Sequence, residues 1–237
     1  MLTKEEKIRY ARMIALPEIG EQGVARLRES TVAVIGCGAL GSVCAMYLAG
    51  AGIGRLIICD FDTIDVSNLQ RQLFYNTADT GKSKAGVLAD RIKALNPECE
   101  VDVREVLASG DEAEKIISEA DFVVDATDNP ESKYQTDRIC HRLSKGYCIG
   151  GISGFAGQAM SWLPGHIRYS DIFAPSASSD GVLPCSLAGV SGPTAGVIAC
   201  TQASETIKHL SGCGKMLLDR VFTIDMLSMQ TSVLEVI

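Results

Sequence analysis

The sequence has no pair of cysteines in C-x-x-C spacing, although its 237 residues include nine cysteines, an odd number. Secreted domains that depend on disulfides usually carry an even set of cysteines. The first ten residues also lack the apolar run of a secretory signal. Both absences favour a cytoplasmic protein whose thiols are reduced.

Positive charge is also in short supply, with 22 Lys and Arg against 29 Asp and Glu, for a net charge of −7. Surfaces that bind nucleic acid or anionic membranes generally carry excess positive charge, so neither partner is expected. Charged residues are missing from stretches 32–54, 146–167 and 181–204. Glycine, serine or proline interrupts each of them, which favours buried segments of an α/β core over membrane helices.

Histidine is scarce as well, with only three residues, and no G-x-S-x-G turn is present. A serine hydrolase needs both a nucleophile elbow and a histidine base. His141, His166 and His209 fall in or near expected helices and a long loop, where surface or capping roles are expected. Hydrolytic chemistry of that type is therefore excluded.

The first part of the chain alternates between apolar runs and helical spacings, after two N-terminal helices. Thr3 and Glu6 form a capping box that predicts a helix over 4–13, and a second amphipathic stretch extends to residue 29. The expected strands are 31–35, 55–59, 100–106 and 122–126, and the expected helices are 40–51, 82–95, 111–120 and 130–143. This alternation is typical of a parallel sheet with helical crossovers.

After residue 145 the pattern changes to short strands with a short connection. Strands are expected over 147–150, 157–163, 221–226 and 231–236, with a loop over 164–184 and a helix over 193–210 that is uncharged until Glu205. We expect one domain with a continuous mixed sheet. It divides into N-terminal helices (1–30), a nucleotide-binding half (31–145) and an antiparallel half (146–237).

A glycine turn follows the first strand in the order Gly36-x-Gly38-x-x-Gly41, and a helix follows the turn. Glycines in this position let the backbone approach a phosphate, and the helix N-terminus supplies free N–H groups. Asp60 ends the next strand, where its carboxylate can accept the ribose hydroxyls. The pattern predicts nucleotide binding without separating NAD from ATP.

Charged residues at the ends of the next strands favour a nucleoside triphosphate over NAD. Cations such as Arg71 and Lys84 can offset charge on phosphates. Asp128, with Asp125 behind it, can hold Mg²⁺ through carboxylates and waters. The alternatives are solvated loop charges for the cations and a helix N-cap for Asp128. The candidate nucleotide-binding residues beyond the glycine turn and Asp60 are Asp62, Asn68, Arg71, Gln72, Lys84, Asp128 and Asn129.

Several longer strings resemble the ThiF/MoeB/HesA adenylyltransferases, the bacterial relatives of ubiquitin-activating enzymes. The resemblance covers nearly the whole chain. It rests on Arg9-Tyr-Ala-Arg12, Pro17-Glu-Ile-Gly20, the glycine turn, Asp60-Phe-Asp-Thr63, Asn68-Leu-Gln-Arg-Gln72, Gly81-Lys-Ser-Lys84, Leu95-Asn-Pro97, Asp125-Ala-Thr-Asp-Asn129, Gly154-Phe-Ala-Gly-Gln158 and Gly192-Pro193.

This resemblance implies a Rossmann-like ATP-binding domain with an eight-stranded sheet, and a homodimer. It implies that Mg·ATP adenylates the C-terminal glycine of a ubiquitin-like sulfur carrier ending in Gly-Gly, for thiamine or molybdopterin synthesis. A sulfurtransferase or cysteine desulfurase is then a further expected partner, and residues 146–237 become the half that binds the carrier and forms the dimer.

The resemblance also implies roles for individual residues. Asp60 would hold the ribose, Asp128 the magnesium, and Arg12 would reach into the ATP site of the partner subunit. The phosphates would be held by Asn68, Arg71 and Lys84. The chemistry is consistent with the small number of histidines, because an ionised glycine carboxylate is itself the nucleophile and needs no general base.

The chain departs from the family in its cysteines. Many members bind structural zinc through two C-x-x-C pairs, and both are missing here, so zinc is not expected. The remaining cysteine at a family position is Cys185, in the long loop. Its matching thiol in relatives is proposed to act in sulfur transfer, while the alternative is an inert loop thiol.

Three other functions stay open from the sequence. The same fold could adenylate a small-molecule or peptide carboxylate, it could be a dinucleotide oxidoreductase, or it could be a scaffold without catalysis. Nucleotide preference distinguishes the oxidoreductase, and pyrophosphate exchange distinguishes the scaffold. A neighbouring gene for a small protein ending in Gly-Gly would favour the carrier over a small carboxylate.

Overall fold

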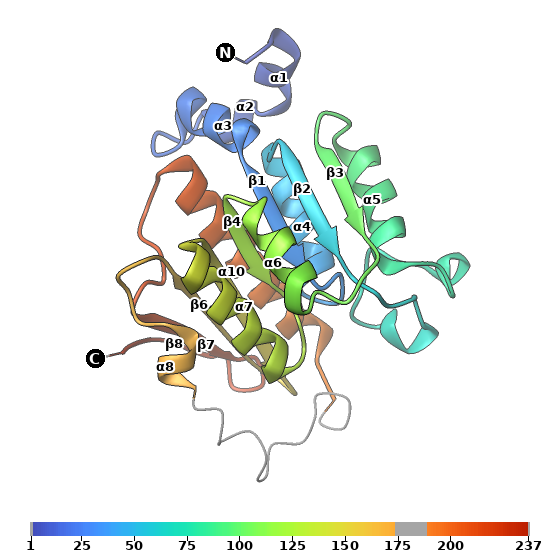
Figure 1. Cartoon of the computed structure of the whole chain (residues 1–237). Helices are drawn as coiled ribbons and strands as arrows, with labels where there is room; N and C mark the ends of the chain where they lie inside the picture. Colours follow the sequence, from blue (N-terminus) through green and yellow to red (C-terminus); the bar gives the residue numbers. More distant parts are fainter. Residues whose placement is uncertain (1, 174–188, 237) are drawn as a thin grey trace.

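The computed structural model describes residues 2–173 and 189–236, which form a central sheet with helices on both faces (Figure 1). In this part of the chain the sheet has eight strands, in the spatial order β3-β2-β1-β4-β5-β6-β7-β8. Five of them are parallel: β3 (Glu100–Arg104), β2 (Arg55–Cys59), β1 (Thr31–Ile35), β4 (Phe122–Asp125) and β5 (Gly146–Ser153). The antiparallel strands are β6 (Ala156–Trp162), β7 (Arg220–Asp225) and β8 (Gln230–Glu235). The expected mixed α/β fold is confirmed.

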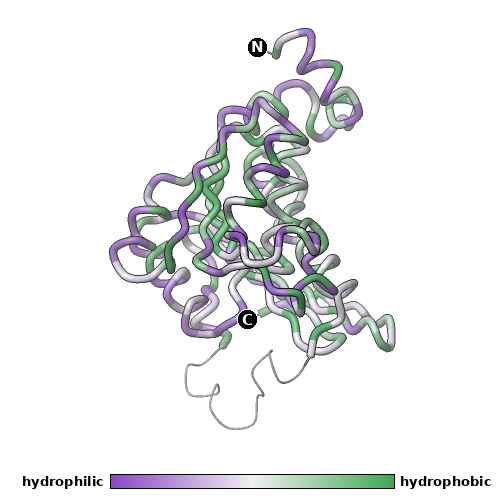
Figure 2. Tube along the Cα trace, turned by 90° about the vertical axis from the view of Figure 1, so that its right-hand side faces the viewer, coloured by the Kyte–Doolittle hydropathy of each residue, from purple (hydrophilic) through white to green (hydrophobic). Residues whose placement is uncertain are grey.

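The parallel strands are apolar because helices cover both of their faces. In β1, Val32 and Val34 pack in one hydrophobic layer while Ala33 and Ile35 pack in the other. Hydrophobic segments accordingly run through the centre of the molecule in Figure 2, with hydrophilic segments toward the outside. The first layer contains α4 (Gly41–Ala51), α5 (Lys84–Leu95) and α10 (Gly192–Ser211), and the second contains α6 (Gly110–Ser118), α7 (Pro130–Leu143) and α8 (Tyr169–Ile172).

The N-terminal segment forms three short helices rather than the expected two. They are α1 (Lys4–Arg9), α2 (Ala11–Ile14) and α3 (Gly20–Glu29). The capping box of Thr3 and Glu6 is present, but the helix over 4–13 breaks at Tyr10. The Tyr10 hydroxyl accepts a hydrogen bond from the Asn96 side chain at 2.8 Å. Its ring packs on Gly52 so closely that a Cβ there would lie 2.8 Å from a ring carbon. Tyr10 therefore attaches α1 and α2 to the rest of the molecule.

The second half differs from expectation in where the sheet changes direction. β5 runs parallel to β4, so the antiparallel part begins only at β6. β5 is also longer than the expected 147–150, because Gly150 lies inside the strand, whereas β6 has the expected length but begins one residue earlier, so that Gly157 lies inside it. A Cβ on Gly150 would lie 2.7 Å from the Gln202 side chain, and one on Gly157 would lie 2.5 Å from Ile198. These glycines allow α10 to pack closely on the sheet.

The region over 61–81 is irregular, as expected, and contains two short 3-10 helices, Val66–Asn68 and Thr77–Asp79. The next helix begins at Lys84 instead of residue 82, because the Ser83 hydroxyl accepts a hydrogen bond from the Gly86 N–H and caps it. The short helix α8 lies where only loop was expected. Within the described residues, no helix is both long and apolar enough to cross a membrane.

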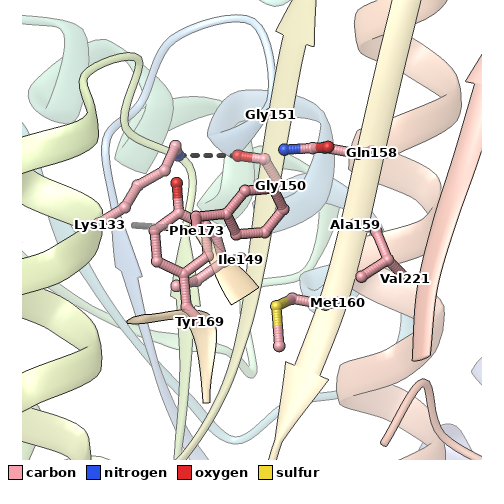
Figure 3. Close-up of a pocket in the computed structure, with 10 residues that line it drawn as sticks. All are labelled: Lys133, Ile149, Gly150, Gly151, Gln158, Ala159, Met160, Tyr169, Phe173 and Val221. Carbon is pink, nitrogen blue, oxygen red and sulfur yellow. Dashed lines mark hydrogen bonds between the residues drawn. The ribbon is translucent and has the colours of Figure 1, made fainter. Parts of the chain in front are cut away.

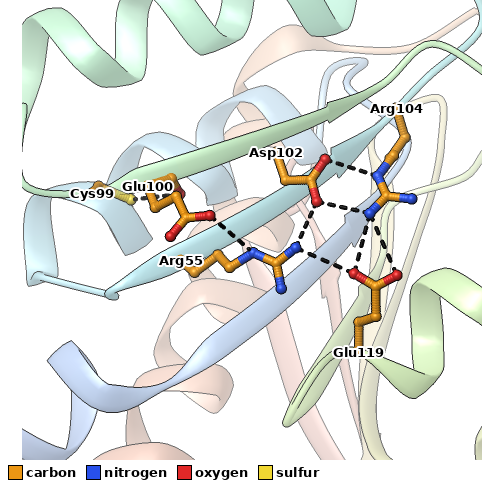
Figure 4. A network of polar contacts seen from close by, with 6 residues as sticks. All are labelled: Arg55, Cys99, Glu100, Asp102, Arg104 and Glu119. Atoms are coloured by element: carbon orange, nitrogen blue, oxygen red, sulfur yellow. Dashed lines mark hydrogen bonds and ion pairs between the residues drawn. The ribbon is translucent and has the colours of Figure 1, made fainter.

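A group of charged side chains joins the edge strand β3 to the start of β2 (Figure 4). Asp102 on β3 accepts hydrogen bonds from Arg104 at 2.8 Å and from Arg55 on β2 at 2.6 Å. Both arginines also pair with Glu119, which follows α6, at 3.1 and 3.2 Å. We call these four residues the β3 charge network. It joins two strands to the end of one helix.

Candidate nucleotide-binding site

The glycine turn lies between β1 and α4, beside the carboxyl end of β4. Gly36 has a φ of +91°, and a Cβ on it would lie 2.9 Å from the Ala126 carbonyl oxygen. A Cβ on Gly41 would lie 1.7 Å from the Gly36 carbonyl oxygen. Gly38 differs, because a Cβ there would meet only the Gln72 amide, at 3.6 Å. Gly36 and Gly41 thus allow the turn to close, and Gly38 leaves its outer surface open to a ligand.

Asp60 lies directly against this turn. Its carboxylate accepts hydrogen bonds from the Cys37 N–H at 2.7 Å and from the Asp62 N–H at 2.8 Å. Burial raises the pKa of Asp60, while these two N–H groups act in the opposite direction. A carboxylate has about four acceptor positions, so two remain for hydroxyl donors. The structure therefore places the Asp60 carboxylate beside the glycine turn, with acceptor positions left for a ligand.

Lys84 is a cation close to Asp60 and Asp62. It is the first residue of α5, only 6% exposed, and its Nζ lies 2.8 Å from an Asp62 carboxylate oxygen. A cation in the first turn opposes the helix dipole, so a nearby anion stabilises it there. Asp62 is the anion in this structure. A phosphate group at this place could be bound by the same ammonium.

The loop over 61–81 is tied to the glycine turn by Tyr75, whose hydroxyl donates to the Cys37 carbonyl at 2.7 Å. Arg71 is partly exposed and donates to the Ser67 carbonyl at 3.0 Å. Gln72 is 4% exposed and its Oε1 is buried without a hydrogen-bond partner. The Gln72 amide nitrogen is the atom nearest to a Cβ on Gly38, and the unsatisfied oxygen of the same amide is consistent with a ligand that completes the site.

Two polar residues near the site, Asn68 in this loop and Asn129 after β4, make local hydrogen bonds. The Asn68 side chain accepts from the Asp65 N–H at 3.3 Å and leaves its amide N–H groups for other partners. Asn129 caps α7, because its side-chain oxygen accepts from the Ser132 N–H at 2.8 Å. The cap considered for Asp128 is thus made by the next residue, and Asp128 is exposed.

Asp125 does not stand behind Asp128 as a second metal ligand, which corrects the expectation. It is fully buried, and its Oδ1 accepts from the Thr127 N–H at 3.0 Å and hydroxyl at 2.7 Å. Lys133 also lies 3.3 Å from this oxygen. Asp125 therefore shapes the turn that carries Asp128, and its carboxylate does not reach the surface.

The fit to Mg²⁺ depends on Asp128 and on phosphates. Among the described residues no cluster of three or more His, Cys, Asp or Glu side chains could hold an ion by itself. Mg²⁺ commonly binds through one or two carboxylates, phosphate oxygens and waters. A single exposed carboxylate at the end of β4 suits that mode of binding, together with a nucleotide.

Two expected residues do not join this site. Arg12 lies in α2, at the end of the sheet where β1 begins, whereas the glycine turn follows the other end of β1 (Figure 1). The 11 residues of α4 separate the two ends by about 16 Å. Cys185 lies outside the residues that the structure describes.

Lys133 is a residue of this region that the sequence analysis missed. It is 7% exposed, and its ammonium contacts the end of β4, the turn that follows it and the Gly150 carbonyl within β5. One signal was available: a cation in the first turns of a helix that begins with Pro130 opposes the helix dipole. Tyr75 had no comparable signal, since its partner is a backbone carbonyl 38 residues away.

Known proteins are similar to this chain over most of its length. The model of the ThiF family matches residues 10–237. A probable molybdopterin-synthase adenylyltransferase from Gracilaria tenuistipitata var. liui is 39% identical over 91% of this chain and 61% of its own length. A sulfur carrier protein adenylyltransferase from Thermus thermophilus is 37% identical over 95% of this chain and 85% of its own length.

Among solved structures, the crystal structure of PaaA superimposes with a TM-score of 0.84, at 24% identity, over 99% of this chain and 75% of that one. That likeness concerns the fold alone. The chain spans about three fifths of the length of the first of its curated relatives. The family model covers nearly all of the chain, and this protein belongs to the ThiF family.

Proposed function

We propose that this protein uses Mg·ATP to adenylate the C-terminal glycine carboxylate of a ubiquitin-like sulfur carrier protein. The observation that carries the proposal is the set of groups at the carboxyl ends of β1, β2 and β4. An open glycine turn, the anchored carboxylate of Asp60, the cations Arg71 and Lys84 and the exposed Asp128 lie there. The names of the relatives from Gracilaria and Thermus support the same reaction.

The reaction needs alignment and charge neutralisation more than proton transfer. The carrier's carboxylate attacks the α-phosphorus, a P–O bond forms, and the bond to the β-phosphate breaks to release pyrophosphate. In our proposal Asp60 fixes the ribose while Lys84 and Arg71 offset the phosphate charge. Magnesium, held by Asp128, would neutralise charge on the leaving pyrophosphate.

The proposal extends to the assembly and to the later steps. We place the protein in the cytoplasm, as a homodimer in which Arg12 serves the neighbouring site, and in the sulfur transfer for molybdopterin or thiamine. A sulfurtransferase or cysteine desulfurase would then supply the sulfur. Cys185 would act only after adenylation, and structural zinc is not part of the proposal.

The test is carrier-dependent exchange of labelled pyrophosphate into ATP. We expect exchange with a carrier that ends in Gly-Gly and none with the same carrier shortened by its last residue. Exchange that requires a small carboxylate instead of a carrier would favour the small-molecule alternative. No exchange with any carboxylate, together with binding of NAD, would overturn adenylation.

A further inference from the structure

Lys133 joins three segments at the end of the sheet that carries the nucleotide site. It is the fourth residue of α7 (Pro130–Leu143). Its Nζ lies 2.7 Å from the Gly150 carbonyl oxygen on β5, as Figure 3 shows, 2.5 Å from the Thr127 carbonyl oxygen and 3.3 Å from Asp125 Oδ1. An ammonium has three N–H groups, so these acceptors use all of them. Lys133 is thereby committed to the protein and has no donor left for a ligand.

Little of Lys133 is exposed to solvent. A cavity of about 10 Å³ beside it, large enough for about one water, is covered by the rings of Tyr169 and Phe173. The ring centroids of these two residues lie 4.7 Å apart. Lys133 is thus a buried cation under two aromatic rings, fixed by backbone oxygens on both sides.

A brace that served stability alone would not require a charge. Replacing a buried ion pair with apolar residues of similar size is often neutral or stabilising. The ammonium also lies near the N-terminal end of α7, where the helix dipole disfavours a cation. The positive charge of Lys133 instead offsets the negative charge of the buried Asp125 carboxylate. Asp125 lies three residues before the exposed Asp128.

We propose that Lys133 is a positioning residue for the metal–nucleotide site. It holds the turn over 125–128 against β5 and so fixes where the Asp128 carboxylate stands. By neutralising Asp125, it leaves Asp128 as the carboxylate of this turn that faces the ligand. This inference rests on the proposed function, because it takes Asp128 to bind the metal that accompanies ATP.

The test compares four variants. Lys133→Met removes the charge and keeps the length, and Lys133→Arg keeps the charge. The double variant Asp125→Asn/Lys133→Met removes both members of the pair, so it leaves no buried unpaired charge and keeps the test valid if Lys133→Met alone folds poorly. Lys145→Met is the matched control, because Lys145 donates to the Ala120 carbonyl at 2.7 Å and braces the opposite end of β4.

Two measurements are made on each folded variant. The first is the affinity for ATP by calorimetry, with Mg²⁺ and with a chelator. The second is the Mg²⁺ concentration that gives half-maximal pyrophosphate exchange. We expect Lys133→Met and the double variant to bind ATP without Mg²⁺ like the parent, yet to lose the gain from Mg²⁺ and to need about tenfold more of it for exchange. Lys133→Arg should stay close to the parent.

A folded double variant with the parental gain from Mg²⁺ would overturn the proposal, as would Lys145→Met showing the same loss. Failure of the proposed function looks different. In that case the parent itself would show no carrier-dependent exchange, while its metal-dependent binding of ATP would still report on Lys133.

Discussion

Asp125 and Asp128 are three residues apart and have opposite environments. Asp125 is fully buried and holds Thr127 and Lys133, whereas Asp128 is exposed at the same strand end. Only the exposed carboxylate can meet a metal that enters with a nucleotide. The difference in burial therefore assigns different roles to two residues of the same type.

We expect Asp128→Ala to lower carrier-dependent pyrophosphate exchange by at least about a hundredfold, because the charge of the leaving group would lose its metal. The melting temperature should stay within a few degrees of the parent, since Asp128 is exposed. Asp90→Ala, an exposed carboxylate on α5, is the control and should exchange normally. A folded Asp128→Ala protein with the parental rate would refute the metal assignment.

Gly150 shows the effect of a single missing methyl group on packing. We expect Gly150→Ala to lower the free energy of unfolding by about 1–3 kcal/mol, because its Cβ would lie 2.7 Å from Gln202 and 2.9 Å from Ile198. Gly151→Ala is the control on the same strand, where the nearest atom is the flexible Gln158 side chain at 3.6 Å. Urea unfolding measures both. Equal costs at the two positions would contradict the close approach of α10.

At the scale of elements, β2, β3 and α6 are linked by the β3 charge network of Arg55, Asp102, Arg104 and Glu119 (Figure 4). Hydrogen bonds from Arg104 hold the pKa of Asp102 below its ordinary value. A carboxylate with a lowered pKa stabilises the fold at pH values above its ordinary pKa. That contribution is lost as the pH falls through the lowered pKa.

We therefore expect Asp102→Asn to cost about 1–2 kcal/mol of unfolding free energy at pH 7. The difference from the parent should begin to shrink at about pH 3.9, where the unfolded chain takes up the proton, and should vanish once the pH is below the lowered pKa of the folded protein. Urea unfolding across this range gives the comparison, with the exposed Asp90→Asn as control. A difference that stays constant with pH would show that charge plays no part.

The elements were predictable where local sequence determines them. The apolar runs of β1, β2 and β4 predict buried parallel strands, and Thr3 and Glu6 predict the start of α1. The break at Tyr10 was not predictable from local sequence, and the side chain of Tyr10 contacts Asn96, which lies 86 residues away. The glycines in β5 and β6 suggested that the strands end there. In the structure they lie inside the strands, where a side chain would collide with α10.

In the candidate site, too, some features could be predicted from the sequence and others could not. Polar residues after parallel strands were expected to meet, because the carboxyl ends of those strands lie at one edge of the sheet. Asp60 and Lys84 do lie at this edge, where Asp60 accepts from the Cys37 N–H of the glycine turn and Lys84 pairs with Asp62 of the neighbouring loop. The burial of Asp125 was not predictable, because it depends on Lys133 and on the backbone of β5.

On the scale of the whole molecule, Arg12 and the glycine turn lie at opposite ends of the sheet (Figure 1). Arg12 is exposed, so its guanidinium is accessible to another copy of the chain. A two-fold axis across the length of α4 would exchange the two ends. The uncharged sequence of α4, with Tyr47 exposed, is compatible with contact between copies along it.

This geometry predicts complementation. Arg12→Ala and Asp128→Ala should each be nearly inactive in pyrophosphate exchange as homodimers. After verified subunit exchange, the mixture should regain activity, because the Arg12→Ala chain keeps its own Asp128 and receives Arg12 from its neighbour. Persistent inactivity of the mixture, or full activity of Arg12→Ala alone, would return Arg12 to the role of a surface charge.

The attachment of Tyr10 to Asn96 and Gly52 has a consequence for motion. α1 and α2 pack mostly on a small cluster around Leu2, Tyr10 and Val24, and Met13 of α2 also contacts the main core. Local opening should expose their amides to hydrogen exchange sooner than those of β1, and Tyr10→Phe should widen that gap. If Arg12 acts on the neighbouring subunit, opening of α1 and α2 in one subunit would leave the nucleotide site of that subunit intact. The neighbouring subunit would lose activity instead, because its site would no longer receive Arg12.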